Sequence, residues 1–323
     1  SLSSFPYKHN PASNLNKSLL PNPHNIVSSK ESIFLINSII TVLGINISTL
    51  KRWTDSGKLS CEKTGGGHRK FTMQHVREFY KSHSDSSKSE HLFLNKKEHK
   101  FLYGLINDRD YKELAQNLAS TSLDADELSV NIIINGLYMN GVSIIDILDY
   151  VVDVAGHIIE NQLQSNQISH AEVYFSRNII TRSVDSLNKD KPNGSFNGKN
   201  ALCVNFEDNL PDIGVVMSEV LLRHEGYNVY NTGSHAELGS LKNIIKDRKI
   251  ELLLFYLCNL QCCNAVIEKN IEKTKTQIHE IVALAKKAKV KVIFGGEGLL
   301  LLKGVEDQIN GSFLTYSDLS RIL

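Results

Sequence analysis

The hydrophobic pattern of the chain changes its period near residue 190, and this change restricts the fold of the last third more than any other feature. Beyond this point, short apolar runs alternate with segments of helical period. Strands that are apolar on both faces are typical of a parallel sheet covered by helices on both sides. The pattern therefore predicts a doubly wound, flavodoxin-like domain with a ligand crevice at the C-terminal ends of its strands. We expect strands at 201–206, 227–232, 251–258, 291–294 and 311–315, and helices at 213–225, 237–248 and in a longer segment to about 287.

The region before the change has helical periodicity throughout and contains no strand signal. Short turns between the helices predict a four-helix-type bundle. Segments of linker composition flank it at 82–90 and 188–200. The expected helices are 96–106, 110–120, 125–140, 143–164 and 169–187. The chain is thus predicted to contain an arm at 1–30, a small module at 31–83, a bundle at 90–188 and an α/β domain at 200–323.

The first thirty residues combine four prolines with many Asn and Ser residues, which predicts a disordered arm. They contain no apolar stretch of the kind that a secretory signal requires, and the chain has no run long enough to span a membrane. Its five cysteines are an odd, scattered set rather than a disulfide framework. We therefore expect a soluble protein of the reducing cytoplasm.

Basic residues are concentrated in the small N-terminal module. The segment from Thr49 to Lys81 contains eight Lys or Arg residues and three Asp or Glu residues, a local charge of +5 in a chain whose net charge is +1. A basic surface confined to one small module is typical of a protein that binds nucleic acid through that module.

The pattern inside this module predicts a helix-turn-helix followed by a hairpin. A helical stretch at 33–45 ends near Gly44, and Asn46 is placed to cap a second helix. That helix would bury Leu50 and Trp53. Gly57 would end it, and two short strands joined by glycines would form a wing at 63–71. The candidate DNA-contacting residues are Thr49, Lys51, Arg52, Lys63, Thr64, His68, Arg69 and Lys70.

Four spaced motifs in this module resemble the MerR-type DNA-binding domain: Leu43-Gly44-Ile45, Thr49-Leu50-Lys51-Arg52-Trp53, Gly57-Lys58-Leu59 and Gly66-Gly67-His68-Arg69-Lys70-Phe71. The resemblance implies a winged helix-turn-helix that binds double-stranded DNA as a dimer or higher oligomer, in a transcriptional regulator. Two alternatives remain. One is an excisionase-like module with the same winged helix, and the other is a hairpin whose glycines form only a flexible loop.

The order of the three parts resembles the cobalamin-dependent photoreceptor repressors of the CarH and LitR type. That family is marked by Asp-x-His-x-x-Gly after the first strand, Ser-x-Leu at the third and Gly-Gly after the fourth. The corresponding segments of this chain run from Asn209 to Gly214 and from Tyr256 to Cys258, followed by the pair Gly295-Gly296. The resemblance implies a repressor with a cobalamin-binding-like domain at its C-terminus.

The residues that would hold cobalamin are replaced. Pro211 stands where the family's histidine donates a nitrogen to cobalt, and Tyr256 stands where a small Ser lines the slot for the nucleotide tail. Leu163, Val173 and Tyr174 replace the Trp and the Glu-His pair that cap the corrin. We therefore expect a degenerate domain that serves oligomerisation or contact with a regulatory protein, with no cofactor.

Several alternatives remain for the C-terminal region. It could bind another small molecule such as heme, or cobalamin in an unusual mode. The candidate axial donors are His157, His170, His224 and His235, although each is expected to be an ordinary surface histidine. Cys258, Cys262 and Cys263 lack the spacing of a zinc site and are expected to be buried thiols. A methyltransferase-like cobalamin carrier is disfavoured by Pro211, and no catalytic motif indicates an enzyme.

Overall fold

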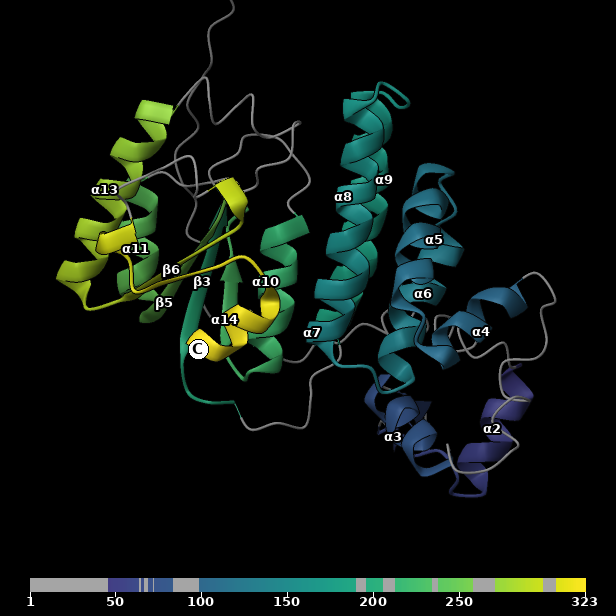
Figure 1. Ribbon diagram of the computed structural model, residues 1–323. Coiled ribbons are helices and arrows are strands. Elements are labelled where there is room, and N and C mark those ends of the chain that lie inside the picture. Colours follow the sequence, from purple (N-terminus) through teal and green to yellow (C-terminus); the bar gives the residue numbers. More distant parts are fainter. Residues whose placement is uncertain are drawn as a thin grey trace, which may run out of the picture.

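The computed structural model describes residues 46–63, 65–66, 69–71, 73–83, 99–189, 196–205, 213–233, 238–257, 271–298 and 306–323. These residues fall into a small winged module, a helical bundle and an α/β unit (Figure 1). The expected arm, the first helix of the helix-turn-helix and the cysteine group at 258–263 lie wholly outside the described residues. So do most of the linker at 82–90 and residues 190–195 of the linker at 188–200.

The winged module consists of α2 (Ile47–Asp55), β1 (Glu62–Lys63), β2 (Arg69–Lys70) and α3 (Met73–His83). The predicted cap is confirmed, because the side chain of Asn46 accepts the N–H of Thr49 at 2.8 Å. Leu50 is buried, and the ring of Trp53 stacks on Phe79 of α3 with centroids 5.0 Å apart. The two helices of the module therefore share one small core.

The bundle agrees with the helices predicted from the sequence to within a few residues. The predicted helix at 143–164 is continuous but contains a π-helical segment that the pattern did not predict. A capping box formed by Ser169 and Glu172 begins the last long helix. The bundle comprises α4 (Lys100–Asp108), α5 (Tyr111–Leu123), α6 (Glu127–Met139), α7 (Ile144–Ile147), the π-helix η3 (Leu148–Val152), α8 (Asp153–Gln164), α9 (His170–Asp185) and the 3₁₀-helix η4 (Ser186–Lys189).

The α/β unit has a five-stranded parallel sheet in the order β4-β3-β5-β6-β7, which is the flavodoxin-like order predicted from the sequence. Its strands are β3 (Asn200–Asn205), β4 (Asn228–Asn231), β5 (Ile250–Tyr256), β6 (Lys291–Gly295) and β7 (Gly311–Phe313). Its helices are α10 (Ile213–His224), α11 (Leu238–Asp247), α13 (Ile271–Ala288), the short 3₁₀-helix η6 (Glu306–Gln308) and α14 (Tyr316–Ile322).

Successive residues of the central strands pack on opposite faces of this sheet. Ala201 and Cys203 of β3 belong to the core shared with α10 and the bundle, whereas Leu202 and Val204 belong to the core under α11 and α13. Figure 1 shows the same arrangement, with α10 and α14 on the side of the bundle and α11 and α13 on the far side. Burial on both faces explains why the strands are continuous apolar runs.

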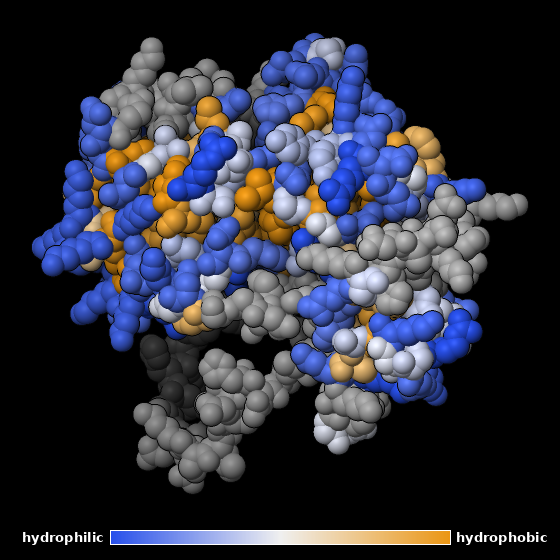
Figure 2. Space-filling model, turned by 60° about the horizontal axis from the view of Figure 1, so that its bottom comes forward, coloured by the Kyte–Doolittle hydropathy of each residue, from blue (hydrophilic) through white to orange (hydrophobic). Residues whose placement is uncertain are grey.

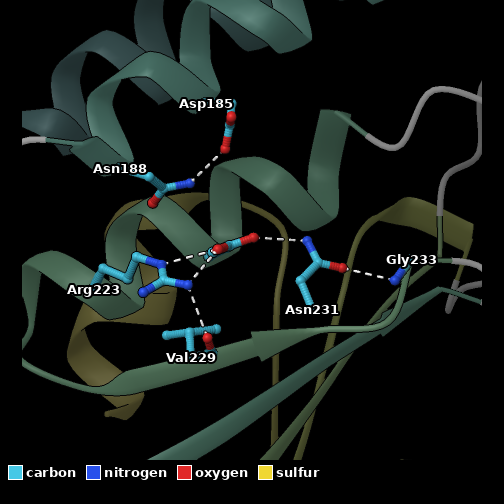
Figure 3. A network of polar contacts seen from close by, with 7 residues as sticks. Asp185, Asn188, Arg223, Val229, Asn231 and Gly233 are labelled. Carbon is cyan, nitrogen blue, oxygen red and sulfur yellow. Dashed lines mark hydrogen bonds and ion pairs between the residues drawn. The ribbon is translucent and has the colours of Figure 1, made fainter. Parts of the chain in front are cut away.

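A polar network holds the edge strand β4 against α10 (Figure 3). Glu219 is 8% exposed, and its carboxylate accepts hydrogen bonds from Arg223 at 2.9 Å and from the side chain of Asn231 at 2.8 Å. Arg223 also donates to the carbonyl of Val229, and Asn231 accepts the N–H of Gly233. The charge of Glu219 is therefore paired and hydrogen-bonded, as a buried carboxylate requires.

The bundle and the α/β unit are joined through α9, which packs on α10, and through α14. Asp149 in the π-helix accepts the backbone N–H groups of Tyr316 and Ser317 at 2.7 and 3.0 Å. Its carboxylate thus caps the start of α14, a helix that the sequence pattern did not predict. On the face shown in Figure 2, the winged module at the lower right is largely hydrophilic, and apolar residues gather over the other two regions. None of the helices in the described ranges is long and apolar enough to span a lipid bilayer.

Candidate functional site

The outer face of α2 carries the first group of candidate DNA contacts. Lys51 and Arg52 are exposed on it, and Thr49 is half-buried beside the capping side chain of Asn46. Leu50, which lies between Thr49 and Lys51 in the sequence, is buried in the core instead. A short helix that presents donors to solvent is the kind of element that enters the major groove in helix-turn-helix proteins.

The wing lies beside the end of α2. Its strands pair in the register Glu62 with Lys70 and Lys63 with Arg69, which confirms the predicted hairpin. The guanidinium of Arg69 forms an ion pair with Asp55, the last residue of α2, and the Arg69 side chain is only 29% exposed. In this structure Arg69 therefore ties the wing to the helix. Lys63 and Lys70 lie in the two strands, whereas the candidate contacts Thr64 and His68 lie outside the described residues.

A shallow cleft separates the start of α8 from the C-terminal edge of the sheet. Asp153 and His157 line it from the bundle, and Tyr256 and Glu297 line it from the α/β unit. Its volume is about 60 Å³. His157 Nε2 lies 3.5 Å from the Asp153 carboxylate, and the hydrogen bond between these side chains raises the pKa of His157. The cleft has the position predicted for a ligand crevice in a sheet of this order.

Aromatic side chains fill the space beside this cleft. A Cβ atom built on Gly214 would lie 2.2 Å from the ring of Tyr256, so only glycine allows the ring to pack against the first turn of α10. The hydroxyl of Tyr316 donates to the carbonyl of Gly214 at 3.0 Å, and burial raises the pKa of Tyr316 well above its ordinary value. The ring of Phe313 lies between the other two, with centroids 6.2 Å from Tyr256 and 5.8 Å from Tyr316.

The pair Gly295-Gly296 at the end of β6 is explained by close contacts in this chain. A Cβ atom on Gly295 would collide with the ring of Phe313, and one on Gly296 would lie 2.2 Å from the carbonyl oxygen of Leu257. Gly296 also has a φ of 90°, a conformation that side chains rarely adopt. Both glycines are therefore required for the close packing of the strand ends.

The three positions of the expected corrin cap lie away from the cleft. Leu163 and Val173 are buried in the bundle, whereas Tyr174 is 48% exposed on α9. The cleft is lined instead by the first two turns of α8. Asn209 and Pro211 lie outside the described residues, so their placement stays a prediction.

One of the four candidate histidine donors differs from expectation. His224 was expected at the surface, but its Nε2 atom is buried at the end of α10. His170 is exposed at the start of α9, and His235 lies outside the described residues. Among the described residues, no group of three or more His, Cys, Asp or Glu side chains is placed to hold a metal ion.

Sequence reasoning did not identify Asp149, which joins the bundle to α14 through two hydrogen bonds. The only signal for it is an acidic residue inside an apolar helical stretch. Such a residue indicates a buried partner but does not identify that partner.

Comparisons with known proteins concern two parts of the chain. Residues 35–81 match the family model described as MerR HTH family regulatory protein, which confirms the resemblance inferred from the four motifs. No curated protein matches the chain.

Three solved structures are similar to 65% of the chain. The first is a monomethylamine corrinoid protein of Methanosarcina barkeri, which is 14% identical to this chain with a TM-score of 0.48. The similarity covers 97% of the length of that protein. A cobalamin-binding protein of Desulfitobacterium hafniense DCB-2 has 14% identity, 98% covered and a TM-score of 0.31. The methanol:cobalamin methyltransferase complex MtaBC of Methanosarcina barkeri has 17% identity, 77% covered and a TM-score of 0.30. The fold assignment itself rests on the strand order and helices described above.

Proposed function

We propose that this protein, whose residues 35–81 match the MerR helix-turn-helix family, is a sequence-specific transcriptional regulator that binds double-stranded DNA in the cytoplasm as a dimer or higher oligomer and acts as a repressor. The observation that carries the proposal is the outer face of α2, where Lys51 and Arg52 are exposed beside the wing. Two such modules related by a twofold axis would read an inverted repeat.

We propose further that the α/β unit binds no cobalamin and serves oligomerisation or contact with a regulatory protein. The residues present do not fit the cofactor. Tyr256 packs against Gly214 where a slot for the nucleotide tail would be needed, and the remaining cleft of about 60 Å³ is far smaller than the roughly 300–1,000 Å³ of typical ligand sites. The substitution of Pro211 for the ligating histidine supports the same proposal.

A second candidate is a regulator that responds to a different small molecule. The observation in its favour is the cleft itself, where His157, Asp153 and Glu297 present polar groups beside the ring of Tyr256. Heme is a weaker candidate than a small polar molecule, because a cleft of about 60 Å³ is far too small for a porphyrin. In neither reading is the protein an enzyme.

Selection of DNA fragments by the full-length protein tests the proposed DNA binding. We expect one inverted-repeat sequence to be enriched, with an affinity that falls steeply as salt rises. Arg52→Ala should weaken binding to it by about tenfold or more, because a hydrogen bond from a charged group to DNA is lost. Arg182→Ala, which removes an exposed arginine of the bundle, is the matched control. Equal affinities for all fragments would contradict the proposal.

Titration of the purified protein with hydroxocobalamin or adenosylcobalamin tests the proposed loss of the cofactor. We expect no spectral shift and no co-elution on gel filtration. Micromolar binding by calorimetry would show that the degenerate-site proposal is wrong, and it would leave the DNA-binding proposal intact.

A further inference from the structure

The three regions of the molecule meet at one side chain, Tyr138, which is buried at the end of α6 in the bundle. The guanidinium of Arg77, from the winged module, lies over the Tyr138 ring. The ring of His224, from the α/β unit, meets the Tyr138 ring in a T-shaped contact. These contacts join residues that are far apart in the sequence, and each comes from a different region.

Arg77 belongs to the basic segment of the winged module, yet its side chain is directed at the bundle. Its guanidinium carbon lies 4.7 Å from the centroid of the Tyr138 ring, and its Nη2 donates to the carbonyl of Gly141 at 3.3 Å. A guanidinium that stacks on an aromatic face and donates to a carbonyl is held in both position and orientation. Arg77 is therefore committed to an intramolecular contact, unlike Lys51 and Arg52.

The other side of the junction comes from the α/β unit. His224 is the last residue of α10, and its ring meets the Tyr138 ring edge to face at 5.7 Å and 76°. It also has a hydrogen bond with the backbone of Leu187 in η4, at the end of the bundle. Within the described part of the chain, its Nε2 atom is buried and makes no hydrogen bond. His224 thus contacts two elements of the bundle at once.

The junction is connected to the recognition helix through the core of the winged module. Val76 and Phe79, which flank Arg77 on α3, are buried, and Phe79 stacks on Trp53 of α2. A rotation of α3 on the bundle would therefore carry α2 with it. The direction in which α2 faces is therefore coupled to how α3 sits on α6.

We propose that Arg77 is a positioning residue that fixes the winged module on the bundle, and that Tyr138 and His224 make this orientation depend on the packing of the α/β unit. The inference rests on the proposed function, because a fixed orientation matters for reading DNA. In a dimer whose recognition helices are held rigidly, only one separation of the two half-sites places both helices in the major groove. The junction therefore determines which half-site spacing the protein accepts.

The test measures the affinity of the full-length protein for inverted repeats whose spacing is changed by single base pairs. We expect the wild type to prefer one spacing, and Arg77→Met to reduce the ratio between the best and the next-best spacing by about tenfold. Methionine keeps an apolar stem on the ring and removes the guanidinium. Arg77→Lys, which keeps the charge and loses the planar stacking, is the second variant and should lie between the two. Arg182→Ala is the control and should match the wild type.

Small-angle scattering of the same proteins without DNA provides an independent measurement. We expect a larger radius of gyration for Arg77→Met than for the wild type at the same oligomeric state. The inference is wrong if the wild type accepts all spacings equally, or if Arg77→Met weakens binding by the same factor at every spacing. If the wild type binds no DNA at all, the proposed function fails, and scattering alone decides whether Arg77 holds the module in place. If Arg77→Met does not fold, Arg77→Lys decides both measurements.

Discussion

Replacing His224 with glutamine tests how much folding stability the protein loses as the pH falls because the His224 imidazole is buried. This imidazole lies at the junction where the three regions meet. Burial lowers the pKa of His224 from its ordinary value of 6.5 to about 4. The positive charge of Arg77 lowers this pKa further, whereas the hydrogen bond with the Leu187 backbone raises it. In the unfolded chain the imidazole takes up a proton as the pH falls below 6.5, whereas the folded protein excludes that proton until about pH 4. Stability is therefore lost between these two values as the pH decreases.

The size of this loss follows from the two pKa values. At about pH 5, the difference between the folded and unfolded states corresponds to roughly 2 kcal/mol of unfolding free energy relative to neutral pH. Residual solvent access to the ring makes this an upper value. Glutamine fills a similar volume and does not titrate, so the variant should lack this part of the pH dependence.

Urea unfolding followed by circular dichroism, at about pH 7 and about pH 5, measures the effect. We expect the wild type to lose roughly 2 kcal/mol more than His224→Gln between the two conditions. His170→Gln, at an exposed histidine at the start of α9, is the control and should behave as the wild type. Identical losses in the wild type and His224→Gln would refute the reasoning and would mean that the imidazole is solvated at the junction.

Two further predictions concern packing. Trp53→Ala should lower the stability of the winged module by about 3 kcal/mol, because it removes the ring that stacks on Phe79. Ile47→Ala, at an exposed position, is the control and should leave the stability unchanged. Equal melting temperatures for the wild type and Trp53→Ala would contradict the assigned helix faces. Gly214→Ala should cost about 1–3 kcal/mol through the collision of its methyl group with Tyr256, and Tyr256→Leu in the same chain should recover part of that loss. Strictly additive costs in this pair would show that the two residues do not touch.

The parts of the fold that were predicted correctly depend on local signals. Asn46 caps α2 because its side chain reaches an N–H three residues away, and Gly57 ends the same helix with a φ of 70°. The strands of the α/β unit are apolar runs because both faces are buried, which a single sequence shows directly.

The parts that were not predicted depend on contacts between distant residues. Asp149 and Tyr316 are 167 positions apart, and nothing near either residue indicates the other. Arg69 and Arg77 contribute to the basic charge of the segment in the same way, yet one pairs with Asp55 and the other stacks on Tyr138. The direction of a long charged side chain is set by the element that packs beside it, and that element is not visible in the local pattern.

The π-helix in the bundle has a consequence for how insertions and deletions act on this protein. A π-helical turn is an α-helix that has accommodated one extra residue. Because the wide turn absorbs the extra residue locally, deleting a single residue from 148–152 would leave a regular α-helix whose two halves keep nearly their present faces. The face of α7 that packs in the bundle and the face of α8 that meets the sheet would both stay in place. A one-residue deletion inside α8 would instead rotate the two parts of that helix by about 100° against each other, so residues 148–152 are where this long helix best tolerates a change of length.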